Sequence, residues 1–232
     1  MTPAALVLFG KIPVPGRVKT RLAKSIGPKH AAALSECFLR DTVRACTALA
    51  AAGIAGGIDP VLAADPAPHP FWDGLVSSPW RVEAQGEGDL GRRIARVFDR
   101  EFVSRERVAV LGSDHPALPW SRLGAFLASS NAIWPTRDGG FAALILTRRG
   151  EIEPLFDGIE WSTPSVFEQT LDRAKKASIE LEIFPETYDV DREEDLEVLA
   201  RDLEGRDSAT PDFPRETWRA LRTFRSARPE LA

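Results

Sequence analysis

The sequence predicts an α/β layered fold with a mainly parallel sheet. Short apolar runs that suit buried strands alternate with amphipathic helical segments over most of the 232 residues. The clearest runs are residues 4–9 and 107–111, which lead directly into Gly10 and Gly112. Ligands in such folds bind beyond the carboxyl ends of the strands, so we expect a functional site in the loops that follow these runs.

The first half of the chain begins with the strand at 4–9 and a basic loop. A long amphipathic helix opens at Gly27-Pro28 and ends before Gly53, with apolar residues at helical spacing. A strand near 54–62 follows, weakened by two glycines and a proline, and then a turn-rich loop at 65–79. Residues 80–84 are expected to form a strand, and residues 89–102 a helix with one apolar side.

The second half continues the alternation. The strand at 107–111 is followed by a helix at 119–129, by strands at 132–135 and 141–147, and by a helix at 164–177. A strand at 179–184 and the segment 188–191 lead into an acidic helix. Beyond this the pattern fades, except for a helix near 215–224. We therefore interpret residues 1–204 as one domain and 205–232 as a peripheral C-terminal extension.

Composition excludes several classes of protein. The formal net charge of −4 argues against general nucleic-acid binding, which usually needs a basic surface. Cys37 and Cys46 lie nine residues apart in one predicted helix, in neither a CxxC nor a zinc spacing, and we expect buried thiols in a reducing cytosol. The chain has no signal-peptide pattern and no run of about 20 apolar residues, so we expect a cytoplasmic protein without a membrane span.

The loop after the first strand, residues 9–22, is an island of positive charge. It holds Lys11, Arg17, Lys19 and Arg21, and no acidic residue appears before Glu36. Such an island can attract an anion even on an acidic protein. The loop is not a Walker motif, because Gly16 is not followed by lysine, and its prolines remove backbone donors. Phosphates would therefore be bound by side chains; the alternative is a solvated basic edge.

Aspartates follow two of the predicted strands. Asp114 comes after the small residues Gly112 and Ser113, where its carboxylate can hold magnesium or manganese and bridge to phosphates. Asp189 or Asp191 could complete a two-carboxylate metal site. The alternatives are structural: a strand-end aspartate often caps a turn, and Asp191 followed by Glu194 fits a capping box equally well.

Two glycine-containing blocks are further candidates. In residues 85–91, Gly86, Gly88 and Gly91 surround a helix start, and Gln85 could present its amide to a base edge; a loop with an Asp89 N-cap is the alternative. The second block is Asp138-Gly139-Gly140, a turn by default, in which Asp138 could bind a hydroxyl or act as a base. His115 adjoins Asp114, and its role is equally well structural.

Together these blocks resemble one family, the bacterial GT-A-like proteins of the DUF2064 group, regarded as candidate glycosyltransferases. The resemblance covers residues 4–200 and implies the nucleotide-diphospho-sugar transferase fold, a three-layer α/β/α sandwich that also serves nucleotidyltransferases. Residues 161–164 and 169–170 match as well. The five main blocks are Lys11-Ile-Pro-Val-Pro-Gly-Arg-Val-Lys-Thr-Arg-Leu22, Gln85-Gly-Glu-Gly-Asp-Leu-Gly91, Leu111-Gly-Ser-Asp-His-Pro116, Asp138-Gly-Gly-Phe141, and Asp189-Val-Asp191 with Glu194-Asp195-Leu196.

The resemblance implies a role for each block. Asp114 and Asp191 would bind magnesium or manganese, and Asp114, Asp138 and Lys19 would be catalytic. The residues expected at the nucleotide are Phe9, Gly10, Lys11, Arg17, Lys19, Arg21, Gln85, Gly86, Gly88, Asp89, Gly91 and Ser113. Those expected at the sugar or acceptor are His115, Arg137, Gly139 and Gly140. Trp134-Pro135-Thr136-Arg137, Phe141 and His115 depart from the usual pattern and leave the acceptor open.

The function expected from the sequence is that of a metal-dependent transferase that uses a nucleotide-activated sugar, with a small-molecule acceptor. One alternative is a nucleotidyltransferase, in which the same cations clamp a nucleoside triphosphate and a phosphorylated acceptor attacks its α-phosphorus. Another is a nucleotide-binding domain without catalysis. The first two differ in their products, since one releases a nucleoside diphosphate and the other pyrophosphate.

Overall fold

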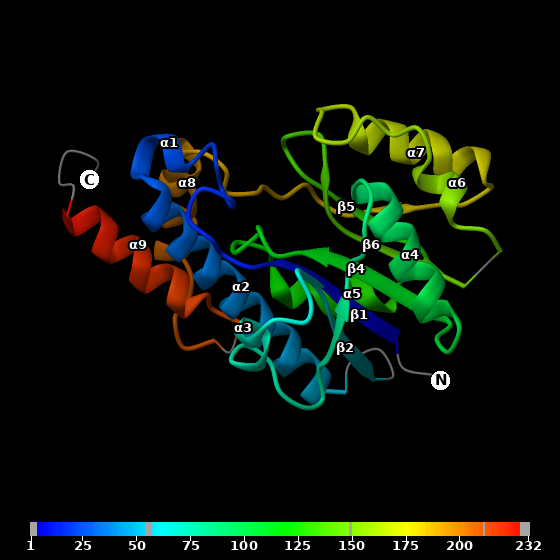
Figure 1. Cartoon of the computed structure of the whole chain (residues 1–232), viewed down its shortest axis with the longest axis horizontal. Helices are drawn as coiled ribbons and strands as arrows, with labels where there is room; N and C mark the ends of the chain where they lie inside the picture. The colour runs from blue at the N-terminus through cyan, green and yellow to red at the C-terminus, as the bar shows by residue number, and fades with distance from the viewer. Residues whose placement is uncertain (1–3, 54–56, 149, 211, 228–232) are drawn as a thin grey trace.

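A seven-stranded sheet lies at the centre of the molecule in the computed structural model, which describes residues 4–53, 57–148, 150–210 and 212–227 (Figure 1). The strand order is β3-β2-β1-β4-β6-β5-β7. The first four strands are parallel, and β6 runs antiparallel to both of its neighbours, so the sheet is mainly parallel, as predicted. The strands are β1 (Ala4–Lys11), β2 (Ile58–Asp65), β3 (Arg81–Ala84), β4 (Arg107–Gly112), β5 (Ala132–Pro135), β6 (Phe141–Thr147) and β7 (Glu182–Ile183).

Helices cover both faces of the sheet, which gives three layers. Leu6 and Leu8 of β1 belong to a core shared with α2, α3 and α5, whereas Ala5 and Val7 belong to a core shared with α4, α6 and α7. This alternation follows from the period of two in a strand, with both faces buried. The helices are α1 (Ala23–Ile26), α2 (Pro28–Ala51), α3 (Pro70–Asp73), α4 (Leu90–Phe102), α5 (Trp120–Ala128), α6 (Glu153–Phe156), α7 (Val166–Lys176), α8 (Glu193–Glu204) and α9 (Arg215–Ala227).

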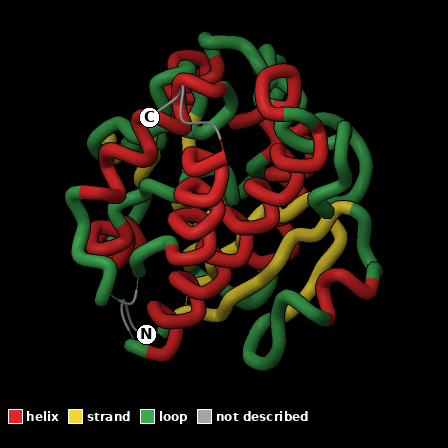
Figure 2. The backbone as a smooth tube through the Cα atoms, turned by 90° about the vertical axis from the view of Figure 1, so that its left-hand side faces the viewer, coloured by secondary structure: helices red, strands yellow, loops and turns green. Residues whose placement is uncertain are grey.

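A third apolar cluster joins α1, α2, α8 and α9, which lie at the left of Figure 1 and face the viewer in Figure 2. Leu221 of α9 is buried in this cluster. The buried carboxylate of Asp41, on α2, accepts hydrogen bonds from the backbone N–H groups of Glu216 and Thr217, at 3.2 and 2.8 Å. Asp41 thus satisfies two donors in the first turn of α9. The domain boundary at 204 stays a prediction.

Most predicted elements are confirmed with small shifts in their ends, but the strand expected at 179–184 is reduced to the two residues of β7, Glu182–Ile183. The strand expected near 54–62 occupies Ile58–Asp65, and residues 54–56 lie outside the described part of the chain. Pro60 is tolerated because β3 begins opposite Val61, so that β2 has a neighbouring strand on one side only at Pro60. The short helices α1, α3 and α6 are not predicted, since four residues are too few to show a helical period.

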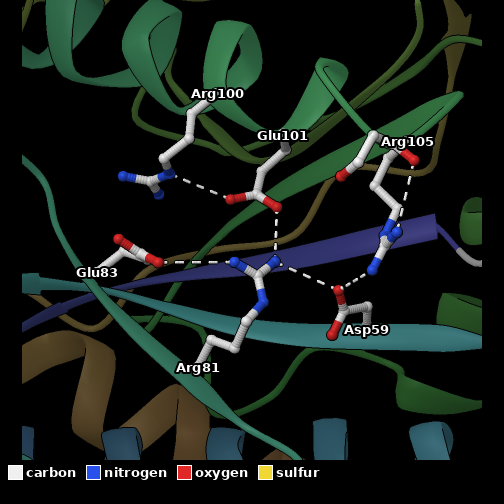
Figure 3. A network of polar contacts seen from close by, with 7 residues as sticks. Asp59, Arg81, Glu83, Arg100, Glu101 and Arg105 are labelled. Carbon is white, nitrogen blue, oxygen red and sulfur yellow. Dashed lines mark hydrogen bonds and ion pairs between the residues drawn. The ribbon is translucent and has the colours of Figure 1, made fainter.

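A polar network holds the edge strand β3 at the amino ends of the strands (Figure 3). The buried carboxylate of Glu101 accepts hydrogen bonds from Arg81 at 2.7 Å and from Arg100 at 3.1 Å. Arg81 also reaches Asp59 of β2 at 3.2 Å, and Arg105 donates to the same carboxylate. The network therefore connects β2, β3 and the end of α4, on the side of the sheet away from the predicted site. No helix in the described ranges is long and apolar enough to cross a membrane.

Candidate functional site

The loops at the carboxyl ends of the strands converge on one edge of the sheet. The basic loop leaves β1 at Lys11, the Ser113-Asp114 turn leaves β4, and the turn at 136–140 leaves β5. The segment 187–191 runs beside them: Thr187 forms a parallel bridge with Thr136, and the Val190 N–H donates to the Asp114 carbonyl at 3.3 Å. Segments from both ends of the chain are therefore joined at one place.

Lys19 lies at the centre of this edge. Its side chain is only 3% exposed, and its Nζ lies 3.0 Å from Asp114 Oδ2 and 2.8 Å from Asp191 Oδ1. Burial by itself lowers the pKa of Lys19, but the attraction of Asp114 and Asp191 outweighs it, so the pKa is raised and the ammonium stays charged. The backbone φ of Lys19 is +45°, a left-handed conformation that non-glycine residues rarely adopt.

Asp191 faces this lysine because another residue caps the next helix. The backbone N–H groups of Asp191 and Arg192 both donate to Asp195 Oδ2, at 2.9 and 2.7 Å. The capping box that the sequence allows for Asp191 and Glu194 is therefore wrong by one position, since α8 begins at Glu193. The Asp191 carboxylate contacts Lys19 and, at 3.6 Å, Arg21. Burial by itself raises the pKa of Asp191, but Lys19, together with Arg21 and a hydrogen bond with Asp189, outweighs it, so the pKa is lowered.

Three carboxylates, those of Asp114, Asp189 and Asp191, interact with the one buried ammonium of Lys19. Burial, followed by repulsion from Asp191 and Asp138, raises the pKa of Asp189 to about 6. Asp114 is 47% exposed and Asp191 is 32% exposed, so both carboxylates can be reached from solvent. In the described residues, no group of three or more His, Cys, Asp or Glu side chains is placed to hold a metal by itself. The negative charge around Lys19, together with the accessible oxygens of Asp114 and Asp191, favours a cation that is shared with a ligand.

His115 lies beneath Asp114 as a buried ring. One ring nitrogen, Nδ1, lies 3.3 Å from the carbonyl of Tyr188, so the imidazole joins the turn after β4 to the segment 187–191. Burial lowers the pKa of His115, more than the nearby Asp114 raises it, so the ring is neutral at pH 7. Its position supports a structural role and brings it into the same cluster as Asp114.

The turn at 136–140 is tightly constrained. Asp138 Oδ1 accepts hydrogen bonds from the Thr136 hydroxyl at 2.6 Å and from the Gly140 N–H at 3.0 Å. Gly139 has φ +85°, and a Cβ at this position would lie 2.0 Å from the carbonyl oxygen of Pro164. The turn therefore needs glycine at position 139. It fixes Asp138 at the rim of the site. Its neighbour Arg137 is exposed.

The block at 85–91 is held together by its own side chains. Gln85 is buried; its Nε2 donates to the carbonyls of Gly10 and Ala63, at 3.0 and 2.9 Å, and its Oε1 accepts from Arg93 at 3.2 Å. The amide thus connects the ends of β1 and β2 to α4. That Gln85 also binds the base of a nucleotide stays a prediction. Asp89 accepts from the Arg92 N–H at 2.9 Å and caps α4, which is the alternative that the sequence offers.

The remaining predicted residues surround this cluster. Five of them are exposed, namely Lys11, Arg17, Arg21, Gly86 and Gly88, and three are partly buried, namely Phe9, Ser113 and Gly140. Gly10 is buried under Trp72, whose ring a Cβ would approach to 3.4 Å. Gly91 is covered by Trp161: a Cβ there would lie 2.7 Å from the indole nitrogen. The packing of these two glycines against indoles has no sequence signal except the motif at 161–164.

Comparison with known proteins agrees with this architecture. A family described as "Uncharacterized protein conserved in bacteria (DUF2064)" matches residues 48–163, which is half of the chain. The solved structure of a "putative nucleotide-diphospho-sugar transferase" from Desulfovibrio desulfuricans G20 has a TM-score of 0.82 and 28% sequence identity, and the match covers 98% of this chain and 96% of that chain. The predicted nucleotide-diphospho-sugar transferase fold is therefore confirmed.

Two other solved structures are much less similar. CMP:2-keto-3-deoxy-manno-octonic acid synthetase, complexed with CTP, has a TM-score of 0.45 and 14% identity over 85% of this chain and 97% of that chain. Rv0371c from Mycobacterium tuberculosis H37Rv has a TM-score of 0.44 and 14% identity over 86% of this chain and 98% of that chain. We draw no conclusion from these two. No curated protein matches the chain by sequence.

Proposed function

This chain belongs to the DUF2064 family, and we propose that it is a transferase that binds a nucleotide-activated sugar at the carboxyl edge of its sheet. The observation that carries the proposal is the buried ammonium of Lys19 between Asp114 and Asp191, where loops after β1 and β4 meet. Such an arrangement of charge at this edge is typical of a ligand site. The similarity to the Desulfovibrio protein over nearly the whole chain supports the same class.

The exposed cations give the site its affinity for phosphates. Lys11, Arg17 and Arg21 lie on the loop that also carries Lys19, and all three are exposed. Their side chains can donate hydrogen bonds to the oxygens of a diphosphate, and arginine can do so with two parallel bonds. The nucleoside would then extend toward the open glycines of the block at 85–91. This direction leaves the turn at 136–140 for the sugar and the acceptor.

The donor chemistry of the site fits a divalent metal. Lys19 contacts Asp114 through Oδ2 and Asp191 through Oδ1, and both carboxylates are partly exposed, so each can also offer an oxygen to a metal. Magnesium is usually held by one or two carboxylates together with substrate phosphates and water, and needs no complete protein cage. Asp114 and Asp191 are the residues that would hold it. A bound metal would neutralise charge on the phosphates.

Sugar transfer breaks the bond between the sugar carbon and a phosphate oxygen, and the departing nucleoside diphosphate gains negative charge. Lys19, held in place by its two carboxylates, and the exposed Arg21 would stabilise this charge. The acceptor hydroxyl must lose a proton as it attacks. Asp138 is the proposed base, because its carboxylate is fixed by Thr136 and Gly140 at the rim where an acceptor would enter.

A thermal-shift panel tests the proposal. Nucleoside diphosphates, triphosphates and nucleotide sugars would each be added with and without manganese, since a ligand that binds only the native state raises the melting temperature. We expect a nucleotide sugar to give the largest shift in melting temperature. Manganese should increase this shift in the wild type but not in the Asp114→Asn variant. Asp172→Asn, an exposed aspartate on α7, is the matched control.

The outcomes separate the alternatives. Release of a nucleoside diphosphate from a nucleotide sugar supports the transferase, whereas release of pyrophosphate from a nucleoside triphosphate would replace it with a nucleotidyltransferase. Nucleotide binding that is unchanged in Asp114→Asn and independent of metal would indicate a domain without this chemistry. If no nucleotide shifts the transition under either condition, the proposal is overturned.

A further inference from the structure

A small pocket beside the predicted site is lined by an aromatic ring and carboxylates. Its volume is about 130 Å³, and it lies between the start of α4 and the loop after α6. The indole of Trp161 forms one wall, and the chemistry at the rim comes from Asp89, Arg92, Glu153 and Asp157. Pockets for drug-sized ligands are larger, on the order of 300–1,000 Å³. This pocket therefore suits a group no larger than a single ring.

Trp161 is held firmly in this wall. Its ring packs on the rings of Phe141 and Phe156, each with a centroid distance of 6.4 Å. Gly91 leaves the space for the indole, because a Cβ at Gly91 would lie 2.7 Å from Trp161 Nε1. Ser162, the next residue, has φ +66°, an uncommon backbone conformation for serine. The tryptophan is thus placed in advance and needs no rearrangement to receive a ligand.

Side-chain hydrogen bonds fix the loop that carries this tryptophan. Gln169 accepts from the Glu160 N–H at 2.8 Å and donates to the Glu160 carboxylate at 3.0 Å. The Thr163 hydroxyl donates to the Glu160 carbonyl at 2.7 Å. The backbone N–H of Phe167 donates to the carbonyl of Gly139, at 2.7 Å. The motif at 161–164 and Gln169 therefore form one rigid unit, which is attached to the turn that carries Asp138.

From this geometry we propose that the pocket binds a monosaccharide ring. The apolar C–H face of a sugar ring can pack on an indole, while its hydroxyls donate to carboxylates such as Asp157 and accept from Arg92. The pocket is lined by Asp89 and Gly91 of the block at 85–91 and by Trp161, whose loop is attached to the turn at 136–140 through the bond from Phe167 to Gly139. The inference rests on the proposed function for its placement, since it assigns a sugar subsite to the site of that function.

Direct binding of sugars tests the subsite without any nucleotide. Saturation-transfer NMR with the methyl glycosides of glucose, galactose, mannose and N-acetylglucosamine should give a signal from at least one of them with the wild-type protein. Trp161→Ala should weaken binding by roughly 2- to 10-fold, and Trp161→Phe should retain most of it. Asp157→Asn should also weaken binding; this residue is exposed, so its loss does not threaten the fold.

Matched controls make the outcome decisive. Asp172→Asn, on the outer face of α7, should bind as the wild type does. The proposal is overturned if none of the glycosides gives a signal, or if Trp161→Ala and Asp157→Asn both bind as well as the wild type. Sugar binding without any nucleotide-induced thermal shift would contradict the proposed function while leaving the subsite in place.

A second arm identifies where the sugar comes from. If the pocket receives the sugar of the donor, Trp161→Ala should reduce the thermal shift with UDP-glucose or another nucleotide sugar that shifts the wild type, and leave the shift with the matching nucleoside diphosphate unchanged. If the pocket receives a separate acceptor, both shifts should stay as in the wild type while glycoside binding is lost. Either result supports a sugar subsite and assigns its occupant.

Discussion

The Nζ atom of Lys19 lies 2.8 Å from Oδ1 of Asp191, although the two residues are 172 positions apart in the sequence. Their contact joins the loop after the first strand to the segment that precedes α8. The ammonium also contacts Asp114 at 3.0 Å, so one cation holds two strand-end segments together. Removing a charged group that is buried in this way would leave two neighbouring carboxylates without their counter-charge.

Replacing Lys19 with methionine tests the structural part of this role. We expect Lys19→Met to lower the free energy of unfolding, because Asp114 and Asp191 would repel each other without the ammonium. The loss should fall below the roughly 3–5 kcal/mol of a fully buried broken pair, since both carboxylates are partly exposed. Urea denaturation measures it, and Lys24→Met, an exposed lysine nearby, is the matched control.

The double variant Lys19→Met with Asp191→Asn completes the cycle. The double variant should lose less free energy of unfolding than the two single variants lose together, because the second change removes one of the unpaired charges. If the losses simply add, Lys19 and Asp191 do not interact energetically, despite the close contact between them.

Two glycines with similar backbone angles should respond differently to alanine. Gly139 has φ +85° and Gly16 has φ +80°, but a Cβ at Gly139 would lie 2.0 Å from the Pro164 oxygen, whereas none of the described atoms lies within 4 Å of a Cβ at Gly16. Gly16→Ala should cost about 1–2 kcal/mol, the penalty of the left-handed backbone alone. Gly139→Ala should cost roughly 3 kcal/mol or more, because it also displaces Pro164. Thermal unfolding of both variants, side by side, would show equal losses if the packing against Pro164 were unimportant.

The sequence predicts the fold well because its signals are local. A buried parallel strand is an apolar run, and α2 and α4 show their period over many residues. The antiparallel direction of β6 has no such signal, since it depends on how the short turn at 136–140 returns the chain. Pairing of the basic loop with Asp114 and Asp191 is also invisible in the sequence, because it is created by the folding of distant segments.

The sequence predicts which residues lie at the candidate site better than it predicts which of them contact one another. Ligand sites in such folds lie beyond the carboxyl ends of the strands, and this rule correctly predicts that Lys19, Asp114 and Asp191 lie at one edge of the sheet. The rule gives no hint that Lys19 is buried between carboxylates while Lys11 and Arg17 stay exposed. It also gives no hint that the amide of Gln85 is occupied within the protein, since the glycines around it suggest an open loop.

Replacing Gln85 with leucine separates its structural contacts from a role at the base. The change removes the side-chain hydrogen bonds to the buried carbonyls of Gly10 and Ala63, and a typical hydrogen bond contributes about 0.5–1.5 kcal/mol. We therefore expect a lower melting temperature with the same order of preference among nucleotides in the thermal-shift panel. A changed order of preference for the base would show that Gln85 touches the nucleotide directly.

The two thiols should react slowly in the folded protein, and Cys46 more slowly than Cys37. Burial raises the pKa of Cys46 to about 12; burial, together with Asp41, raises that of Cys37 to about 11. Relative to an ordinary thiol of pKa 9.0, the thiolate fraction at pH 8 is then lower by about 100-fold at Cys37 and about 1,000-fold at Cys46.

Alkylation with iodoacetamide, followed by mass spectrometry of the peptides, measures both rates. A thiol with a raised pKa forms little reactive thiolate until the pH approaches that pKa. The alkylation rate at Cys37 should therefore rise steeply between pH 8 and pH 10 in the native protein. Both cysteines should react at similar, fast rates in guanidinium chloride, where burial is lost. Rapid modification of Cys46 in the native state at pH 8 would show that α2 opens locally from the sheet, because this thiol is fully buried between them.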